Sequence, residues 1–151
     1  MRKSLAVEYS RQLKSDPQRR EYGRKGNLLT SAKDIDMLFT TLDLDYAIGH
    51  FPELSLKHLI PGTRLTLAYL RRLVFHSHRS SYYLLLERGI YKRPRRWPMS
   101  YLAGIVHCLL ENDWHPITWL LTLEVTQGKY AAYRNYLENR NSRSIQPAPI
   151  K

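Results

Sequence analysis

The sequence predicts one small all-α domain with a helix-turn-helix and a basic N-terminal arm. The chain has 151 residues, of which 43% are hydrophobic, and this is enough for a single core. Beyond residue 30, apolar residues recur at spacings of three and four, and glycines and prolines separate the periodic stretches. We therefore expect an arm over residues 1–30, a helical domain over 31–140 and a disordered tail over 141–151.

Residues 1–30 are predicted to form the basic, flexible arm. Residues 1–26 hold eight Lys or Arg against three acids, and Pro17, Gly23 and Gly26 interrupt them. Few large aliphatic side chains are present, so a continuous apolar stripe is not expected. Such an arm can bind phosphates or a minor groove, or it can serve only as a solubilising tail.

The first predicted helix begins near Ser31, with Asp34 three residues later as a variant of a capping box. Gly49 and Pro52 are expected to end it. Residues 27–63 hold five acids against two lysines. These acids can cover a basic face of the same chain, remain solvated, or mark a surface for a protein partner. The apolar face of this helix carries Ile35, Leu38, Phe39, Leu42 and Tyr46.

Residues 55–73 have the spacing of a helix-turn-helix. A short helix is expected over 55–60, a turn at Pro61-Gly62, and a second helix with Thr66 as its N-cap. An ordinary pair of core helices with solvated arginines is the alternative. In the helix-turn-helix, Leu56 and Leu59 would pack on Leu65, Leu70 and Leu73, and the groove-facing candidates are Thr66, Leu67, Tyr69, Arg71 and Arg72.

Four further helices are expected, joined by a basic loop. A short apolar helix over 80–87 ends at Gly89, and the two prolines of residues 91–98 predict an irregular surface loop. The remaining helices cover 100–111, 116–126 with Pro116 in its first turn, and 129–139 after Gly128.

The strongest functional signal is the charge of residues 64–96, which hold nine Lys or Arg and one acid, Glu87. Their excess of eight supplies most of the chain's net charge of +11, and a nucleic-acid backbone is the anion that best complements it. DNA is favoured over RNA because the helix-turn-helix spacing suits a major groove. The predicted contact residues are Arg64, Thr66, Tyr69, Arg71, Arg72 and Arg79 on or near the second helix, and Lys92, Arg93, Arg95 and Arg96 in the loop.

The order of these elements resembles the C subunit of the flagellar master transcription activator and its relatives in plasmids and mobile elements. The best local likeness is the segment 132–139, Ala-Tyr-Arg-Asn-Tyr-Leu-Glu-Asn, which is similar to that family's Ala-Tyr-Arg-x-Tyr-Leu-Glu-Gln. The resemblance covers about residues 34–139 and implies an all-helical DNA-binding subunit that acts with a second protein at promoters. That family also has a four-cysteine zinc site, which the single Cys108 cannot supply, so zinc is not expected.

The predicted function is that of a sequence-specific DNA-binding transcriptional regulator, and the sequence leaves two alternatives open. One is a non-catalytic helical subunit of a ribonucleoprotein or mobile-element complex. The other is a metal-dependent nickase, in which His76 and His78 on a strand would hold the ion and Tyr133 or Tyr136 would be the nucleophile. No enzyme activity, cofactor or metal is expected. A cytoplasmic protein that forms a homo-oligomer or pairs with a partner subunit is expected, with no membrane segment.

Overall fold

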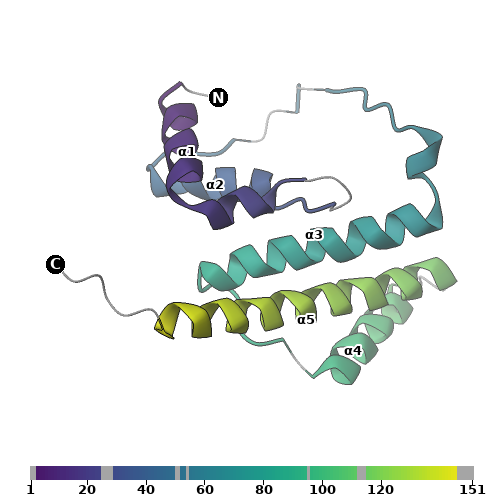
Figure 1. Cartoon of the computed structure of the whole chain (residues 1–151). Helices are drawn as coiled ribbons and strands as arrows, with labels where there is room; N and C mark the ends of the chain where they lie inside the picture. The colour runs from purple at the N-terminus through teal and green to yellow at the C-terminus, as the bar shows by residue number, and fades with distance from the viewer. Residues whose placement is uncertain are drawn as a thin grey trace.

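All regular structure in the described parts of the chain is helical, which confirms the predicted all-α class. The computed structural model describes residues 3–24, 29–49, 52–53, 55–94, 96–111 and 115–145. None of the helices in these ranges is both long and apolar enough to cross a bilayer. Five α-helices and two short 3₁₀ helices follow one another in Figure 1: α1 (Lys3–Ser15), η1 (Pro17–Tyr22), α2 (Lys33–Asp43), η2 (Gly62–Arg64), α3 (Leu67–Glu87), α4 (Trp97–Leu110) and α5 (Pro116–Ile145).

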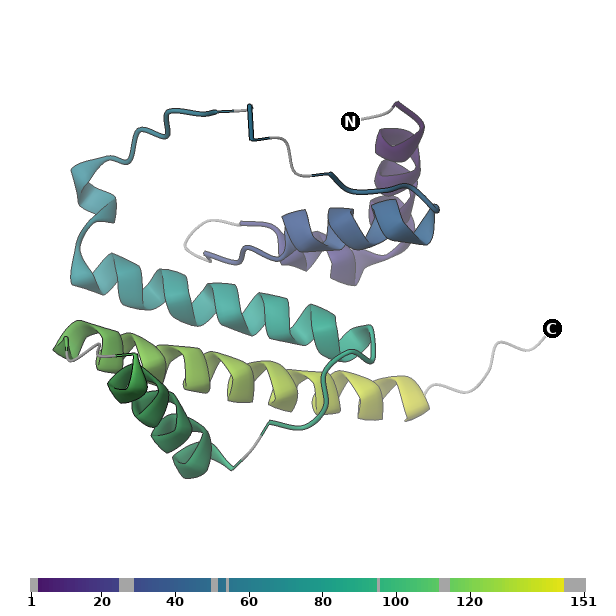
Figure 2. The same cartoon turned by 180° about the vertical axis from the view of Figure 1, so that it is seen from behind.

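The two longest helices, α3 and α5, lie side by side and run in the same direction. Arg71 pairs with Glu124 near their starts, and Tyr83 receives a hydrogen bond from Asn139 near the other end. Residues further along α3 therefore contact residues further along α5, as in a parallel pair. A parallel pair needs a return connection, and residues 88–96 with α4 carry the chain back to the start of α5 (Figures 1 and 2).

Gly128 lies in the interior of α5, where it permits close packing on α3. The sequence predicts a break there between two helices, and this prediction is wrong because α5 is continuous. A Cβ at Gly128 would lie 2.7 Å from the backbone oxygen of Phe75 and 3.2 Å from the backbone nitrogen of Arg79. The loss of helix propensity, about 1 kcal/mol for a glycine, is offset by this approach of the two backbones.

Helix α3 is also longer than predicted, because the separate helix expected over 80–87 is its continuation. No glycine or proline interrupts residues 67–87, so the hydrogen-bond ladder has no reason to break. Both predicted ends are confirmed. The Thr66 hydroxyl accepts a hydrogen bond from the Tyr69 backbone N–H, and Gly89, just beyond the helix, has a φ of 68°.

The N-terminal segment is ordered into helices, so the prediction of an arm without regular structure is wrong for residues 3–22. Leu5 and Tyr9 of α1 are buried. Arg19 of η1 donates hydrogen bonds to both carboxylate oxygens of Asp36, which is fully buried on α2, and to Thr40 at 2.8 Å. A buried ion pair thus supplies part of the packing that an aliphatic stripe would otherwise provide.

The hydrophobic core lies at one end of the α3–α5 pair, where η1 and α2 cover it. The ring centroid of Tyr83 lies 6.4 Å from that of Tyr22 and 6.3 Å from that of Tyr136, distances at which aromatic rings pack favourably. Asp43 on α2 closes the same end through an ion pair with Arg88, whose guanidinium also lies over the Phe39 ring. The core comprises Tyr22, Ala32, Tyr82, Tyr83, Leu84, Leu86 and Ala132, with Ile35, Phe39, Tyr133 and Tyr136 packed against it.

Several other predicted boundaries differ from the structure. Residues 55–60 form no helix, and Leu56 and Leu59 are exposed rather than packed on the residues expected, so the predicted helix-turn-helix lacks its first helix. Six residues without a packing surface cannot offset the cost of helix nucleation.

The ends of three other helices also differ from the prediction. Helix α2 begins after Ala32 without a side-chain cap, so the predicted capping box at Ser31 is wrong. The loop prediction holds for 91–94 and 96, but α4 already begins at Trp97. Helix α5 reaches Ile145, and residues 146–151 of the predicted tail lie outside the described ranges.

Replacing Gly128 with alanine should destabilise the protein by about 1–3 kcal/mol, because the added methyl group forces two helix backbones apart. Urea unfolding followed by circular dichroism measures this. Gly62→Ala is the matched control, since no atom lies within 4 Å of a Cβ there. Equal stability of the two variants would contradict the close approach of α3 and α5.

Candidate nucleic-acid interface

The N-terminal half of α3 extends beyond the part of the bundle that α1, η1 and α2 cover (Figures 1 and 2). Residues 61–68 are all exposed, and Tyr69 and Leu70 are half-buried. Thr66 uses its hydroxyl to cap the helix, which fixes where α3 begins. This end of α3 therefore has the accessibility that a helix needs in order to enter a groove of nucleic acid.

Arg71 is held by an ion pair that the sequence did not indicate. Its Nε donates to Oε1 of Glu124 at 2.7 Å, and its Nη2 lies 2.6 Å from the same oxygen. The Glu124 carboxylate is buried, whereas the Arg71 side chain is half-exposed. Arg71 thus neutralises a buried acid and ties α3 to α5, and any contact with a nucleic acid would use the remaining edge of its guanidinium.

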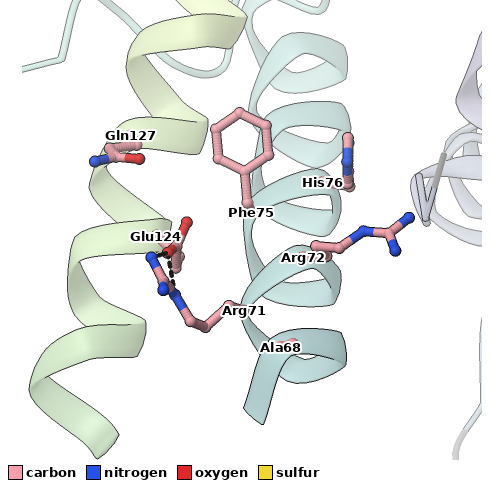
Figure 3. A pocket seen from close by; sticks show the side chains of 7 residues that line it. All are labelled: Ala68, Arg71, Arg72, Phe75, His76, Glu124 and Gln127. Carbon is pink, nitrogen blue, oxygen red and sulfur yellow. Dashed lines mark hydrogen bonds and ion pairs between the residues drawn. The ribbon is translucent and has the colours of Figure 1, made fainter. Parts of the chain in front are cut away.

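A hollow of about 440 Å³ opens between the first halves of α3 and α5 (Figure 3). The Arg71–Glu124 pair spans the two helices in this view, and Arg72 points away from α5. The ring centroid of Phe75 lies 5.2 Å from that of His76 in an edge-to-face arrangement. The hollow thus brings an aromatic ring, guanidinium groups and a carboxylate together. Its lining residues are Ala68, Arg71, Arg72, Phe75, His76, Glu124 and Gln127.

His76 is the unusual polar group of this hollow. Its Nδ1 atom is buried and has no hydrogen-bond partner. Burial lowers the pKa of His76 below its usual 6.5, and the positive charges of Arg79 and Arg72 lower it further. The imidazole is therefore neutral near pH 7 and offers an acceptor where the neighbouring arginines offer only donors.

The histidine pair required by the nickase hypothesis does not have the geometry that the hypothesis assumed. His76 and His78 lie on α3 rather than on a strand, and two positions along a helix turn a side chain by about 200°. The two rings therefore point to different sides. Among the residues that the structure describes, no group of three or more His, Cys, Asp or Glu is placed to hold a metal ion.

The predicted contact residues fall into two groups along α3. Arg64 and Arg72 are exposed near its start, and Arg79 lies further along, half-buried beside Asn135 of α5. Lys92 belongs to the second group, which is attached at the far end, because the Tyr82 hydroxyl donates to its backbone oxygen at 2.9 Å. Positions 72 and 82 are separated by about 15 Å along the helix.

The loop of the second group is braced by aromatic packing. The ring centroids of Tyr91 and Tyr82 are 5.0 Å apart, so the loop begins from a fixed point on α3. Lys92, Arg93 and Arg96 are exposed, and Arg95 lies outside the described residues. The loop can therefore present its cations to a backbone, and nothing in its geometry aims them at base edges.

Two acids of the acidic segment, residues 27–63, form ion pairs with arginines of the same chain, as one of the alternatives from the sequence predicted. Asp36 pairs with Arg19 and Asp43 pairs with Arg88. Arg88, although part of the basic region, is thus engaged with α2. Sequence reasoning missed Glu124, Phe75 and Gln127 as site residues, because only the parallel packing of α5 on α3 brings Glu124 and Gln127 to the predicted helix.

Comparisons with protein families, with curated proteins and with solved structures found no match to this chain.

Arg71→Ala should lower the free energy of unfolding by about 1–3 kcal/mol, because it leaves the buried Glu124 carboxylate without its partner. Arg134→Ala is the control. Its ion pair with Glu138 is exposed on both sides, and its loss should cost less than about 0.5 kcal/mol. Chemical denaturation of both variants tests this, and an Arg71→Ala protein as stable as the control would refute the role of the pair.

His76 should make the protein less stable as the pH falls below about 6.5. The native pKa lies below the unfolded one, so in that window the unfolded chain binds more protons and acidification favours unfolding. Melting temperatures measured from about pH 7.5 to 5 should fall more steeply for the wild type than for His76→Gln. His58→Gln, which alters an exposed histidine, should keep the wild-type slope. Parallel profiles for all three proteins would count against a buried neutral imidazole.

Proposed function

We propose that this chain is a nucleic-acid-binding protein, with DNA favoured over RNA, that acts as a sequence-specific transcriptional regulator. The observation that carries the proposal is the exposed N-terminal end of α3, where Arg64 and Arg72 are both exposed. The partial positive charge of a helix N-terminus adds to the attraction for phosphates. No catalytic step is part of the proposal.

In this proposal α3 is the recognition helix, but it differs from that of a helix-turn-helix in how it is supported. The helix expected over 55–60 does not form, so α3 would be held by α5 instead, through Gly128 and the Arg71–Glu124 pair. Exposure and position make Arg64 and Arg72 the candidate reading residues, while Thr66 also caps the helix and Arg71 also balances a buried acid. Arginine suits this role because it can contact guanine with two donors.

The loop over 91–96 has a separate role in the proposal. Lys92, Arg93 and Arg96 would contact the phosphate backbone, which positions a protein without reading sequence. Its attachment to the far end of α3 through Tyr82 and Tyr91 sets it apart from the reading residues. Such a division of contacts makes specificity and overall affinity separable by mutation.

A second candidate, a non-catalytic subunit bound to single-stranded nucleic acid, is favoured by the hollow between α3 and α5. Phe75 offers a ring on which an unpaired base can stack, and Gln127 can hydrogen-bond to a base edge. Binding of single strands in preference to duplex, lost in Phe75→Leu, would support this candidate over the regulator.

The resemblance to the C subunit of the flagellar activator stays a prediction. In the structure the similar segment serves the core, since Ala132 is buried and Tyr133 and Tyr136 pack against the buried cluster. A homo-oligomer or a partner subunit, as that resemblance implies, remains part of the proposal, and so does a cytoplasmic location.

The regulator proposal is tested by sequencing the nucleic acid that the tagged protein retains after nuclease digestion, followed by affinity measurements on the enriched site and on random duplex. Arg72→Ala should weaken the enriched site by about 1–3 kcal/mol and leave random duplex nearly unchanged. The double variant Arg93→Ala/Arg96→Ala should weaken both equally and reduce the slope of log affinity against log salt by about one per lost contact.

Arg11→Ala is the matched control, because Arg11 is an exposed arginine of α1 whose ion pair in the described structure is local, with Glu8. It should bind like the wild type. Equal losses on specific and random duplex in Arg72→Ala would remove sequence reading from the proposal. No binding to any duplex or single strand at low salt would overturn the proposed function as a whole.

A further inference from the structure

Helix α4 presents an uncharged, apolar face that nothing covers in the described structure. It contains no Asp, Glu, Lys or Arg from Trp97 to Leu110, in a chain with a net charge of +11. Four large side chains are exposed on it: Met99 by 59%, Leu102 by 61%, Val106 by 53% and Leu110 by 78%. Their spacing of three, four and four residues places them in one stripe along the helix. We call these four residues the α4 stripe.

The opposite side of α4 accounts for how this helix is held. Gly104 lies against the Thr122 side chain of α5, and the Cys108 sulfur lies 3.7 Å from the Thr122 hydroxyl oxygen. In both views α4 lies on the side of α5 away from α1 and α2, as the outer layer of the bundle (Figures 1 and 2). The α4 stripe is therefore not an unfilled part of the core, because the core side of the helix is already packed.

We infer that the α4 stripe is a dimer interface, and that its occupant is α4 of a second copy of this chain. Two copies that each carry +11 repel one another wherever their basic surfaces meet. The α4 stripe is a helical face where they can approach without placing like charges in contact. An acidic partner would instead be attracted to the basic surfaces and gains nothing from a helix without charges.

The size and shape of the α4 stripe suit a two-fold pair. The four exposures together equal about two and a half fully exposed side chains on each copy, and a two-fold axis buries the same set twice. Ala103, small and exposed beside the stripe, lets two helices approach to about 8–10 Å. An apolar centre with a rim from exposed Pro98 and His107 has the arrangement of a small specific interface, so a weak dimer is expected.

This pairing does not depend on nucleic-acid binding, but it would supply the homo-oligomer that the proposed function includes. The exposed loop cations at Lys92, Arg93 and Arg96 immediately precede α4, so an α4 pair would bring two such loops to one assembly. Each copy would also contribute one exposed α3 end. Two-fold binding of this kind matches two half-sites on a duplex.

The test is sedimentation velocity of the full chain over about 1–100 μM, in about 0.5 M salt and after nuclease treatment so that nucleic acid cannot bridge copies. The wild-type mass should rise with concentration from 17.9 kDa toward twice that value. Leu102→Glu should weaken self-association at least ten-fold, since each dimer would then bury two unpaired carboxylates. Its melting temperature as a monomer should match that of the wild type at low concentration, because Leu102 is exposed there.

Leu42→Glu is the matched control. Leu42 is a half-exposed leucine on α2, far from α4 in the chain, and its replacement should leave the dimer intact. A wild-type chain that stays at 17.9 kDa up to the highest concentration would overturn the inference and would leave the α4 stripe to a different protein. A dimer that Leu102→Glu does not weaken would overturn it as well.

Discussion

The close approach of α3 and α5 at Gly128 is the constraint on which the rest of this structure depends. One backbone lies against the other there, with the carbonyl oxygen of Phe75 and the amide nitrogen of Arg79 where a side chain would otherwise stand. That contact sets the distance at which Arg71 reaches Glu124 toward one end of the pair and Tyr83 reaches Tyr136 toward the other. Both pairs are separated by 53 positions, so the two helices keep one register along their shared length.

This register explains why the two ends of the pair differ. The tyrosine-rich end is enclosed by η1 and α2, whose Arg19, Asp36 and Asp43 complete the packing with polar contacts. At the other end, α3 is tied to α5 by the Arg71–Glu124 pair, and the two helices open into the hollow beside Phe75. A stable core and an accessible helix end can coexist because the buried aromatic side chains of α3, Tyr82 and Tyr83, lie on its second half. The exposed half carries charge that the core could not accommodate.

Local chemistry made part of this fold predictable. Thr66, Gly89 and Pro116 act at helix ends through their own hydroxyl, φ angle or missing N–H, and each is read correctly without knowledge of the partner helix. Gly128 is different, because the same residue type that ends one helix can sit inside another when a neighbouring backbone fills the space. Leu56 and Leu59 show the opposite error. Their spacing is helical, but the structure gives them no surface to pack on.

The candidate site was predictable only as far as it depends on charge. The arginines at 64 and 72 and the loop cations are evident from the sequence, and the structure leaves those that it describes exposed. Glu124 and Gln127 could not be assigned to the site, because their proximity to Arg71 and Phe75 follows from a packing of segments some fifty residues apart. The N-terminal arm was misjudged for a related reason. A buried ion pair with Asp36 replaces the aliphatic stripe whose absence suggested disorder.

The parallel direction of α3 and α5 also bears on how this chain reaches its native state. Helices that follow one another in an antiparallel hairpin make their contacts across a short loop, whereas each contact between α3 and α5 closes a loop of about fifty residues. Residues 88–96, α4 and the first turns of α5 must be synthesised and released before the first of these contacts can form. The topology thus implies slower folding than in an up-and-down helical bundle of equal length. Until α5 docks, the face of α3 that packs on α5 stays open to water. Docking of α5 is therefore the step that completes the core.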